Sequence, residues 1–108
     1  MDENLKKIKE IILQTAKEMN IEIDKIILFG SRARGDYRED SDYDLLIVTK
    51  EKLEREKERK FKIEISLKVV NELECAIDIF VYSKEEFEKY KNTYGSLLGI
   101  ANYYGKEI

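Results

Sequence analysis

Two apolar runs joined by a polar stretch constrain the fold of this chain most strongly. The run Ile26–Phe29 leads into the stretch Gly30–Asp44, and the run Leu45–Val48 leads out of it. Short apolar runs bounded by turn residues are typical of buried strands. The pattern therefore predicts a strand over residues 25–29, a tight turn, one helical turn, a loop and a second strand over residues 42–48.

The turn between these strands has its own residue signature. We expect Ser31 to cap a short helix over residues 32–34, because serine accepts a hydrogen bond from the first helical turn. Gly35 is well placed to end that helix. Residues 36–41 are polar and indicate a loop, in which the acids Asp36, Glu39 and Asp40 are expected to face solvent.

The same turn is a candidate phosphate site. Gly30 and Ser31 stand where a strand gives way to a helix, and free backbone N–H groups at such a junction point outward. Arg32 and Arg34, with Arg38 further along, are placed to pair with polyphosphate oxygens. The alternatives are an ordinary strand-to-helix turn and plain surface charge.

Three aspartates are the candidate metal ligands and catalytic residues. Asp42 and Asp44 are two apart in a predicted strand, so their side chains face the same way. Asp78 lies in another apolar run, where a lone charge is costly unless something compensates it; a strand-end aspartate that reaches water is the alternative. Carboxylates about 4 Å apart repel by roughly 4 kcal/mol at an effective dielectric of about 20. Oxygen ligands without His or Cys favour Mg²⁺, or alternatively Mn²⁺.

The rest of the chain is predicted to form helices around a third strand. Three- and four-residue spacing of apolar residues predicts a helix over residues 3–19. Residues 50–74 are also expected to be helical, as one solvated helix or a hairpin, although the alternation over residues 61–69 leaves an edge strand open. The third strand is expected over residues 75–82, followed by a helix and by a last short helix over residues 97–104.

Ser83 and Glu86 form a predicted capping box at the start of the helix after the third strand. Helical crossovers would then separate the three strands. The expected class is α/β or α+β, with helices packed on a small mixed sheet of three or more strands.

Composition limits the function classes. The 108 residues suit one domain, and 43% hydrophobic with 40% charged residues indicates a soluble globule. A net charge of -3 gives no electrostatic case for nucleic-acid binding. No apolar run spans a bilayer, so no membrane association is expected and a cytoplasmic location is predicted. There is no histidine, which removes imidazole zinc sites and His-based catalysis, and the single Cys75 cannot form an internal disulfide.

These motifs together resemble a known family. Gly30-Ser31, ten residues, Asp42-Tyr43-Asp44 and a later strand with Asp78 are similar to the DNA polymerase β-type nucleotidyltransferases. The continuation Arg32–Gly35 most resembles their minimal nucleotidyltransferase (MNT) antitoxin branch. The resemblance covers most of residues 20–85 and implies a nucleotidyltransferase fold, with residues 1–108 as a single minimal nucleotidyltransferase domain.

The resemblance also implies an activity. Members of this branch are similar to antitoxins that transfer AMP from ATP to a tyrosine of a HEPN-domain ribonuclease toxin. Two Mg²⁺ ions would suit in-line attack on an α-phosphate with diphosphate leaving. Asp42 and Asp44 would then bind both ions, and Asp78 the ion nearer the attacking hydroxyl. Gly30 would let the backbone approach the triphosphate, and Ser31 would donate hydrogen bonds to it.

Two other functions remain open. Aminoglycoside-type nucleotidyltransferases use the same acids on a small-molecule hydroxyl, but usually with an additional domain. A non-catalytic antitoxin would instead block its toxin by occlusion, through an exposed aromatic surface at Tyr90, Tyr94, Tyr103 and Tyr104. The alternative for these tyrosines is ordinary packing in the core and at its rim.

Overall fold

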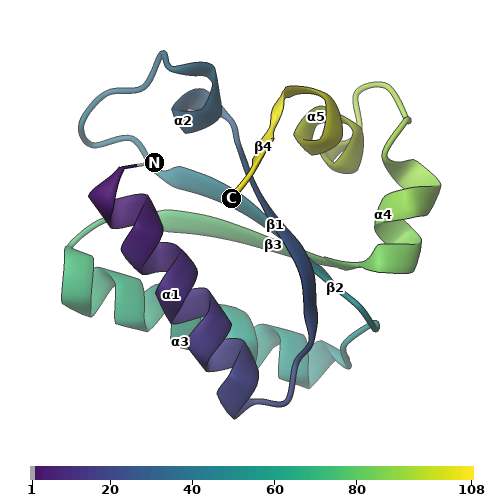
Figure 1. The fold of residues 1–108 in the computed structure, drawn as a ribbon, viewed down its shortest axis with the longest axis horizontal. Coiled ribbons are helices and arrows are strands. Elements are labelled where there is room, and N and C mark those ends of the chain that lie inside the picture. The colour runs from purple at the N-terminus through teal and green to yellow at the C-terminus, as the bar shows by residue number, and fades with distance from the viewer. Residues whose placement is uncertain (1) are drawn as a thin grey trace.

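The chain folds around a four-stranded sheet with helices on both of its faces (Figure 1). The computed structural model describes residues 2–108. The elements, in chain order, are α1 (Glu3–Glu18), β1 (Ile23–Phe29), α2 (Ser31–Arg34), β2 (Tyr43–Thr49), α3 (Arg55–Leu73), β3 (Ile77–Ser83), α4 (Lys84–Tyr90), α5 (Leu97–Tyr104) and β4 (Lys106–Glu107). The predicted α/β class with a mixed sheet is confirmed.

The sheet has the order β3-β2-β1-β4. β2 runs parallel to β3, with α3 as the helical crossover between them. The crossover expected between β1 and β2 is wrong, because α2 is only four residues long and the chain turns back, so these strands are antiparallel. The short β4, which the sequence did not indicate, pairs with the other side of β1.

Both faces of β1 and β2 are covered, as their unbroken apolar runs indicate. Ile26 and Leu28 pack with α1 and α3 on one face, whereas Ile27 and Phe29 pack with α4 and α5 on the other. The alternation continues along β2, with Leu45 and the other odd-numbered apolar residues on the α1–α3 face. The strands β1 and β2 therefore form the centre of the molecule and hold whatever lies at their ends in fixed positions.

The segment before β3 is one continuous helix, so the edge-strand and hairpin alternatives are wrong. Phe61, Ile65 and Val69 are fully buried, at four-residue steps. Ile63 and Leu67 between them are 45% and 58% exposed. The apparent two-residue alternation arose because apolar side chains also occupy the outer side of α3.

Side chains cap the starts of α1 and α4, and of these two caps only the α4 capping box was predicted. Asp2 caps α1 by accepting a hydrogen bond from the Leu5 N–H. Ser83 and Glu86 form the predicted capping box at the start of α4. No helix within residues 2–108 combines the length and the apolar character needed to cross a bilayer.

A cross-helix ion pair gives a test of the α1–α3 packing. Lys68 on α3 donates hydrogen bonds to Glu18 and to Thr15 of α1, each at 3.1 Å. These contacts lower the pKa of Glu18, first through the Lys68 hydrogen bond, then through the Gln14 hydrogen bond and the Lys68 charge.

We expect Glu18→Gln to destabilise the protein slightly at neutral pH. Because the folded state lowers the pKa of Glu18 below its ordinary value of 4.5, the pair stabilises above that pH and its contribution is lost as the pH falls through the folded pKa. Chemical unfolding at pH 7 and pH 3 measures the difference between Glu18→Gln and the unchanged protein. A difference that persists undiminished at pH 3 would contradict the ion-pair explanation.

Candidate active site

The three predicted metal ligands lie at one end of the sheet. Asp44 on β2 and Asp78 on β3 are register partners on parallel neighbouring strands, so their side chains lie on the same face. Asp42 comes directly before β2, two residues from Asp44. On this face the next inward residues of β2 are Leu46 and Val48, which pack with α4 and α5. The acids therefore lie where β2 and β3 begin and β1 ends.

The charges of these aspartates affect one another. The pKa of Asp44 is raised above its ordinary value, first by partial burial, then by the charges of Asp78 and Asp42. The guanidinium of Arg34 lowers it in part. The three carboxylates are therefore close enough to repel, which is the arrangement that a bound cation relieves.

The donor chemistry fits a hard divalent cation, since all three groups are carboxylates. Within residues 2–108, however, no three His, Cys, Asp or Glu side chains are grouped so as to hold a metal ion. The structure brings Asp44 and Asp78 together in register and Asp42 beside them, and the two-ion site on these residues stays a prediction.

The surroundings of Asp78 differ from those expected from the sequence. The expected cost of a charge inside a core strand does not arise, because β3 is the outer strand of the sheet and Asp78, its second residue, is exposed. The strand-end alternative is correct for its solvation. Its register with Asp44 is what places it at the candidate site.

Gly30 makes room for Asp44. Its backbone has φ +74° and ψ −156°, a region that essentially only glycine occupies. A Cβ at this position would overlap the Asp44 Oδ2 atom and lie 3.1 Å from its Cγ. Because Phe29 and Asp44 are register partners, the chain leaving β1 passes directly beside the Asp44 carboxylate.

Ser31 does not cap α2. Gly30 is the N-cap residue and Ser31 is the first helical residue, with no side-chain capping hydrogen bond. The N–H groups of Ala33 and Arg34 both donate to the Gly30 carbonyl at 3.1 Å, so the turn uses them internally. Gly35 ends the helix in the left-handed conformation, as predicted. Phosphate binding by Gly30 and Ser31 stays a prediction.

The two candidate phosphate-binding arginines have different surroundings. Arg34 is exposed, pairs with Asp36 at 3.3 Å and lies close enough to Asp44 to lower its pKa. Arg32 is half-buried and donates its hydrogen bonds to backbone carbonyls of the loop before β2. Arg34 is therefore the arginine whose charge reaches the acids.

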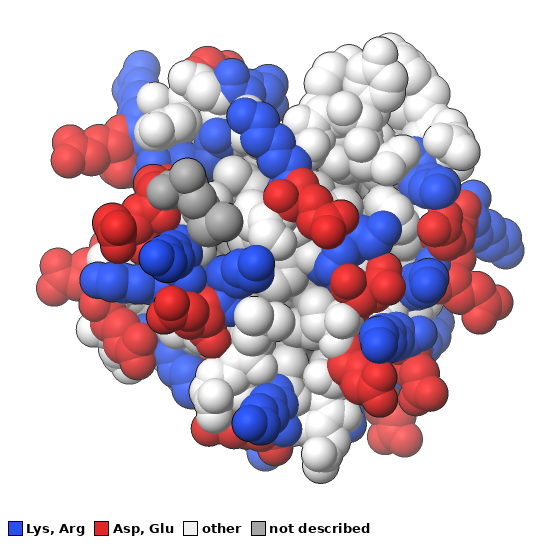
Figure 2. Space-filling view, viewed as in Figure 1, with Lys and Arg blue, Asp and Glu red and all other residues white. Residues whose placement is uncertain are grey.

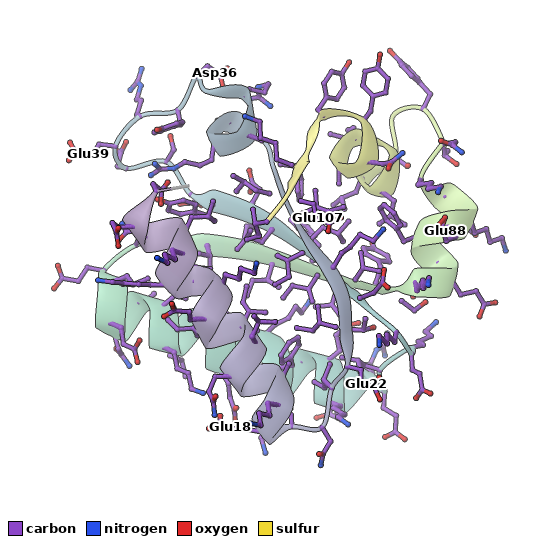
Figure 3. The ribbon with its side chains drawn as sticks, viewed as in Figure 1. Glu18, Glu22, Asp36, Glu39, Glu88 and Glu107 are labelled. Atoms are coloured by element: carbon purple, nitrogen blue, oxygen red, sulfur yellow. The ribbon has the colours of Figure 1, made fainter. Side chains whose placement is uncertain are left out.

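The loop acids are exposed, as expected. Figure 3 shows Asp36 and Glu39 on the outer side of the loop between α2 and β2. Two tyrosines near the site were not singled out from the sequence. The Arg32 guanidinium lies over the rings of both Tyr37 and Tyr43. The position of Tyr43, between two acids at the start of an apolar strand, could have indicated a buried hydrogen bond, because a buried tyrosine needs a partner for its hydroxyl.

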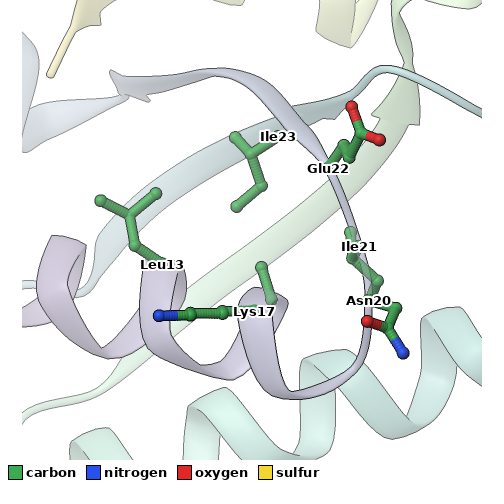
Figure 4. A pocket seen from close by; sticks show the side chains of 7 residues that line it. Leu13, Lys17, Asn20, Ile21, Glu22 and Ile23 are labelled. Atoms are coloured by element: carbon green, nitrogen blue, oxygen red, sulfur yellow. The ribbon is translucent and has the colours of Figure 1, made fainter.

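Other surface features lie away from these acids. A pocket of about 430 Å³ lies where α1 ends and β1 begins, the opposite end of β1 from Gly30 (Figure 4). Both charge signs are interspersed over much of the face in Figure 2, while the area over α5 and the loop before it is uncharged. We assign neither feature to the chemistry of the aspartates.

The mixed sheet carries acids on two neighbouring strands beside the Gly30-Ser31 turn, as the resemblance to nucleotidyltransferases implies. The chain belongs to the nucleotidyltransferase domain family, whose model matches residues 5–97. The family predicted from the sequence is therefore confirmed.

Two relatives come from Methanocaldococcus jannaschii, and both are 38% identical to this chain. "Putative protein adenylyltransferase MJ0141" aligns over 79 residues, which are 69% of this chain and 79% of the relative. "Putative protein adenylyltransferase MJ0604" aligns over 84 residues, 78% of each chain.

The fold also matches a solved structure described as a toxin-antitoxin with AMP-PNP. The TM-score is 0.52 and the sequence identity 17%, over 91% of this chain and 69% of the other. At this identity the match shows the fold alone.

Proposed function

We propose that this nucleotidyltransferase is a protein adenylyltransferase that acts as an antitoxin, transferring AMP from ATP to a tyrosine of a HEPN-domain ribonuclease toxin. The observation that carries the chemistry is the register of Asp44 with Asp78, which places two carboxylates side by side at the end of the sheet next to the Gly30 turn. The two M. jannaschii relatives support protein as the acceptor. The toxin-antitoxin structure with AMP-PNP supports the partner and the nucleotide through fold similarity.

The reaction forms one bond and breaks another at the α-phosphorus. The tyrosine oxygen attacks that phosphorus, the bond to the β-phosphate bridging oxygen breaks, and diphosphate leaves. Asp78 is exposed on the outer strand β3, and it would accept the hydroxyl proton. Arg34 supplies a positive charge near Asp44 on the side where phosphates would lie.

Asp42 and Asp44 would hold two Mg²⁺ ions, or Mn²⁺ in their place, and Asp78 would complete the site nearer the acceptor. Bound there, the cations would neutralise the triphosphate and lower the pKa of the attacking hydroxyl. Gly30 keeps this side of the Asp44 carboxylate free of any side chain, so that the backbone can approach the nucleotide.

Incubation with α-labelled ATP, Mg²⁺ and a HEPN toxin tests the proposal. We expect label on the toxin and none when its acceptor tyrosine is replaced by phenylalanine. γ-Labelled ATP should label nothing, because the γ-phosphate leaves with diphosphate. Label transfer from γ-labelled ATP, or to a small-molecule alcohol in preference to the toxin, would contradict the proposal.

An uncharged aromatic surface favours occlusion as a second function. Tyr94, Tyr103 and Tyr104 are 102%, 80% and 61% exposed, and Tyr90 is 43% exposed, so core packing does not explain them. Tyr94, Tyr103 and Tyr104 line a groove of about 620 Å³ on α5 and the preceding loop, and Tyr90 directly precedes Lys91, another residue of its lining. The area over α5 and that loop is largely uncharged in Figure 2. Toxin binding and inhibition without ATP, lost in Tyr103→Ser, would favour occlusion.

A further inference from the structure

We propose that Arg32 is a positioning residue that fixes the place of Asp42, and not a phosphate ligand. The inference rests on the proposed function, because Asp42 needs a fixed position only if it serves as a ligand in that reaction. It also reassigns one of the two arginines that the sequence suggested for the phosphates.

Arg32 binds the backbone just before Asp42, at the carbonyls of Glu39 and Ser41. Its Nε and Nη2 atoms donate to the Ser41 carbonyl at 3.2 and 2.9 Å, and Nη2 also donates to the Glu39 carbonyl at 3.1 Å. The Ser41 carbonyl belongs to the peptide group that joins Ser41 to Asp42. A planar guanidinium that grips this carbonyl with two donors fixes the peptide plane, and therefore the direction of the Asp42 side chain.

The guanidinium itself packs against two aromatic rings. It lies 4.3 Å from the centre of the Tyr37 ring and 4.2 Å from that of Tyr43. Tyr43 is only 2% exposed, and its hydroxyl donates to the Asp2 carboxylate, at 3.2 and 3.3 Å from the two oxygens. Because Asp2 also caps α1, Arg32 is connected through Tyr43 to the packed core.

The loop has little else to hold it. Within residues 36–41 every residue except Ser41 is exposed, and the one large apolar ring, that of Tyr37, is 45% exposed and lies against Arg32 itself. A local turn exists, in which the Ser41 hydroxyl accepts from the Arg38 N–H at 2.8 Å and the Ser41 N–H donates to the Arg38 carbonyl at 3.0 Å. This turn shapes the loop but does not attach it to the sheet. Arg32 makes that attachment, and three of its hydrogen bonds are thereby unavailable to a phosphate.

The test compares Arg32→Ala and Arg32→Lys with the matched control Arg38→Ala, which removes an exposed arginine of the same loop. Mn²⁺ binding to the protein without ATP is measured by electron paramagnetic resonance, and loop order by amide hydrogen exchange. We expect Arg32→Ala to weaken Mn²⁺ binding about 10-fold or more, in the range for residues that orient metal ligands. Exchange should accelerate at Ser41 and Asp42. Arg32→Lys should rescue little, because an ammonium cannot grip and stack as the guanidinium does. Arg38→Ala should change the Mn²⁺ affinity by no more than about twofold.

Kinetics separates this role from phosphate binding. A positioning residue raises the Mg²⁺ concentration needed for half-maximal rate, while the KM for ATP changes little. An unchanged Mn²⁺ affinity in Arg32→Ala with a raised KM for ATP would overturn the proposal, as would an absence of Mn²⁺ binding by the unchanged protein. Should Arg32→Ala not fold, Tyr37→Leu removes only the outer ring and should weaken Mn²⁺ binding in the same direction. If the unchanged protein transfers AMP to none of the toxins tested, the proposed function is refuted, whereas the result on Mn²⁺ binding still stands.

Discussion

Replacing Asp42 and Asp44 together by asparagine is expected to reduce AMP transfer by about a thousandfold or more. Each amide keeps the size of the side chain but removes the negative charge that holds a divalent cation. Loss of one preorganised electrostatic group at a reacting centre commonly costs about 10²–10³ in rate, and here two are removed at once. Single-turnover measurement with α-labelled ATP and excess enzyme reports the chemical step. Label transfer within tenfold of the unchanged protein would refute the assignment.

The same substitutions should not destabilise the metal-free fold. Partial burial and the charges of Asp78 and Asp42 raise the pKa of Asp44, which means that its ionised form is disfavoured in the folded chain. Asparagine removes that repulsion, so the thermal midpoint of Asp42→Asn/Asp44→Asn without metal should equal or exceed that of the unchanged protein at pH 7. A control with Glu39→Gln and Asp40→Asn removes two exposed loop charges and should keep its activity.

The contrast between these outcomes separates a catalytic from a structural role. Acids that only stabilised the fold would lower the thermal midpoint when neutralised, and their loss of activity would follow the loss of folded protein. We expect the opposite, with inactive protein that is at least as stable. Addition of Mg²⁺ should raise the midpoint of the unchanged protein but not that of the double variant, because ligand binding stabilises only a fold that has the site.

The sequence predicted most of the fold, because its apolar runs are short and clearly bounded. The β1 and β2 runs correctly indicated buried strands. Where the pattern alone is ambiguous, the sequence left the edge-strand alternative open beside the helix that proved correct. Alternation over residues 61–69 fits a strand, yet only its four-residue subset is buried. The expected crossover between β1 and β2 was wrong although the single helical turn over residues 32–34 was predicted, because one turn is too short to connect parallel strands.

The residues of the candidate site were proposed from the sequence, but the contacts between them could not be. The spacing of Asp42 and Asp44 fixes their shared direction in any strand, so their proximity could be read from the chain. The roles of Arg32 and Arg34 could not, because two arginines in one helical turn look alike in sequence. Their difference comes from long-range packing against Tyr43 and the loop carbonyls, which only the folded chain brings together.

Gly30→Ala is expected to damage both stability and activity. The backbone there has φ +74° and ψ −156°, a conformation whose cost for a residue with a Cβ is about 1–3 kcal/mol. The new methyl would overlap Asp44 Oδ2 and approach the Asp44 Cβ to 3.3 Å, so the carboxylate must turn away. Displacing a reacting group by about 1 Å can cost about 100-fold in rate. Urea unfolding and single-turnover labelling measure the two effects.

Gly35→Ala is the matched control for the backbone contribution. Gly35 also has a positive φ, +87°, but no atom of residues 2–108 lies within 4 Å of a Cβ placed there, so only the strain of about 1 kcal/mol should appear. A double-mutant cycle isolates the contact. In an Asp44→Ala background the carboxylate is gone, and the cost of Gly30→Ala should fall to the backbone part alone. If the cost is the same in both backgrounds, Gly30 serves only the turn. A coupling between the two positions would instead tie the glycine to the place of the carboxylate, which explains why the strand must end there in a residue without a side chain.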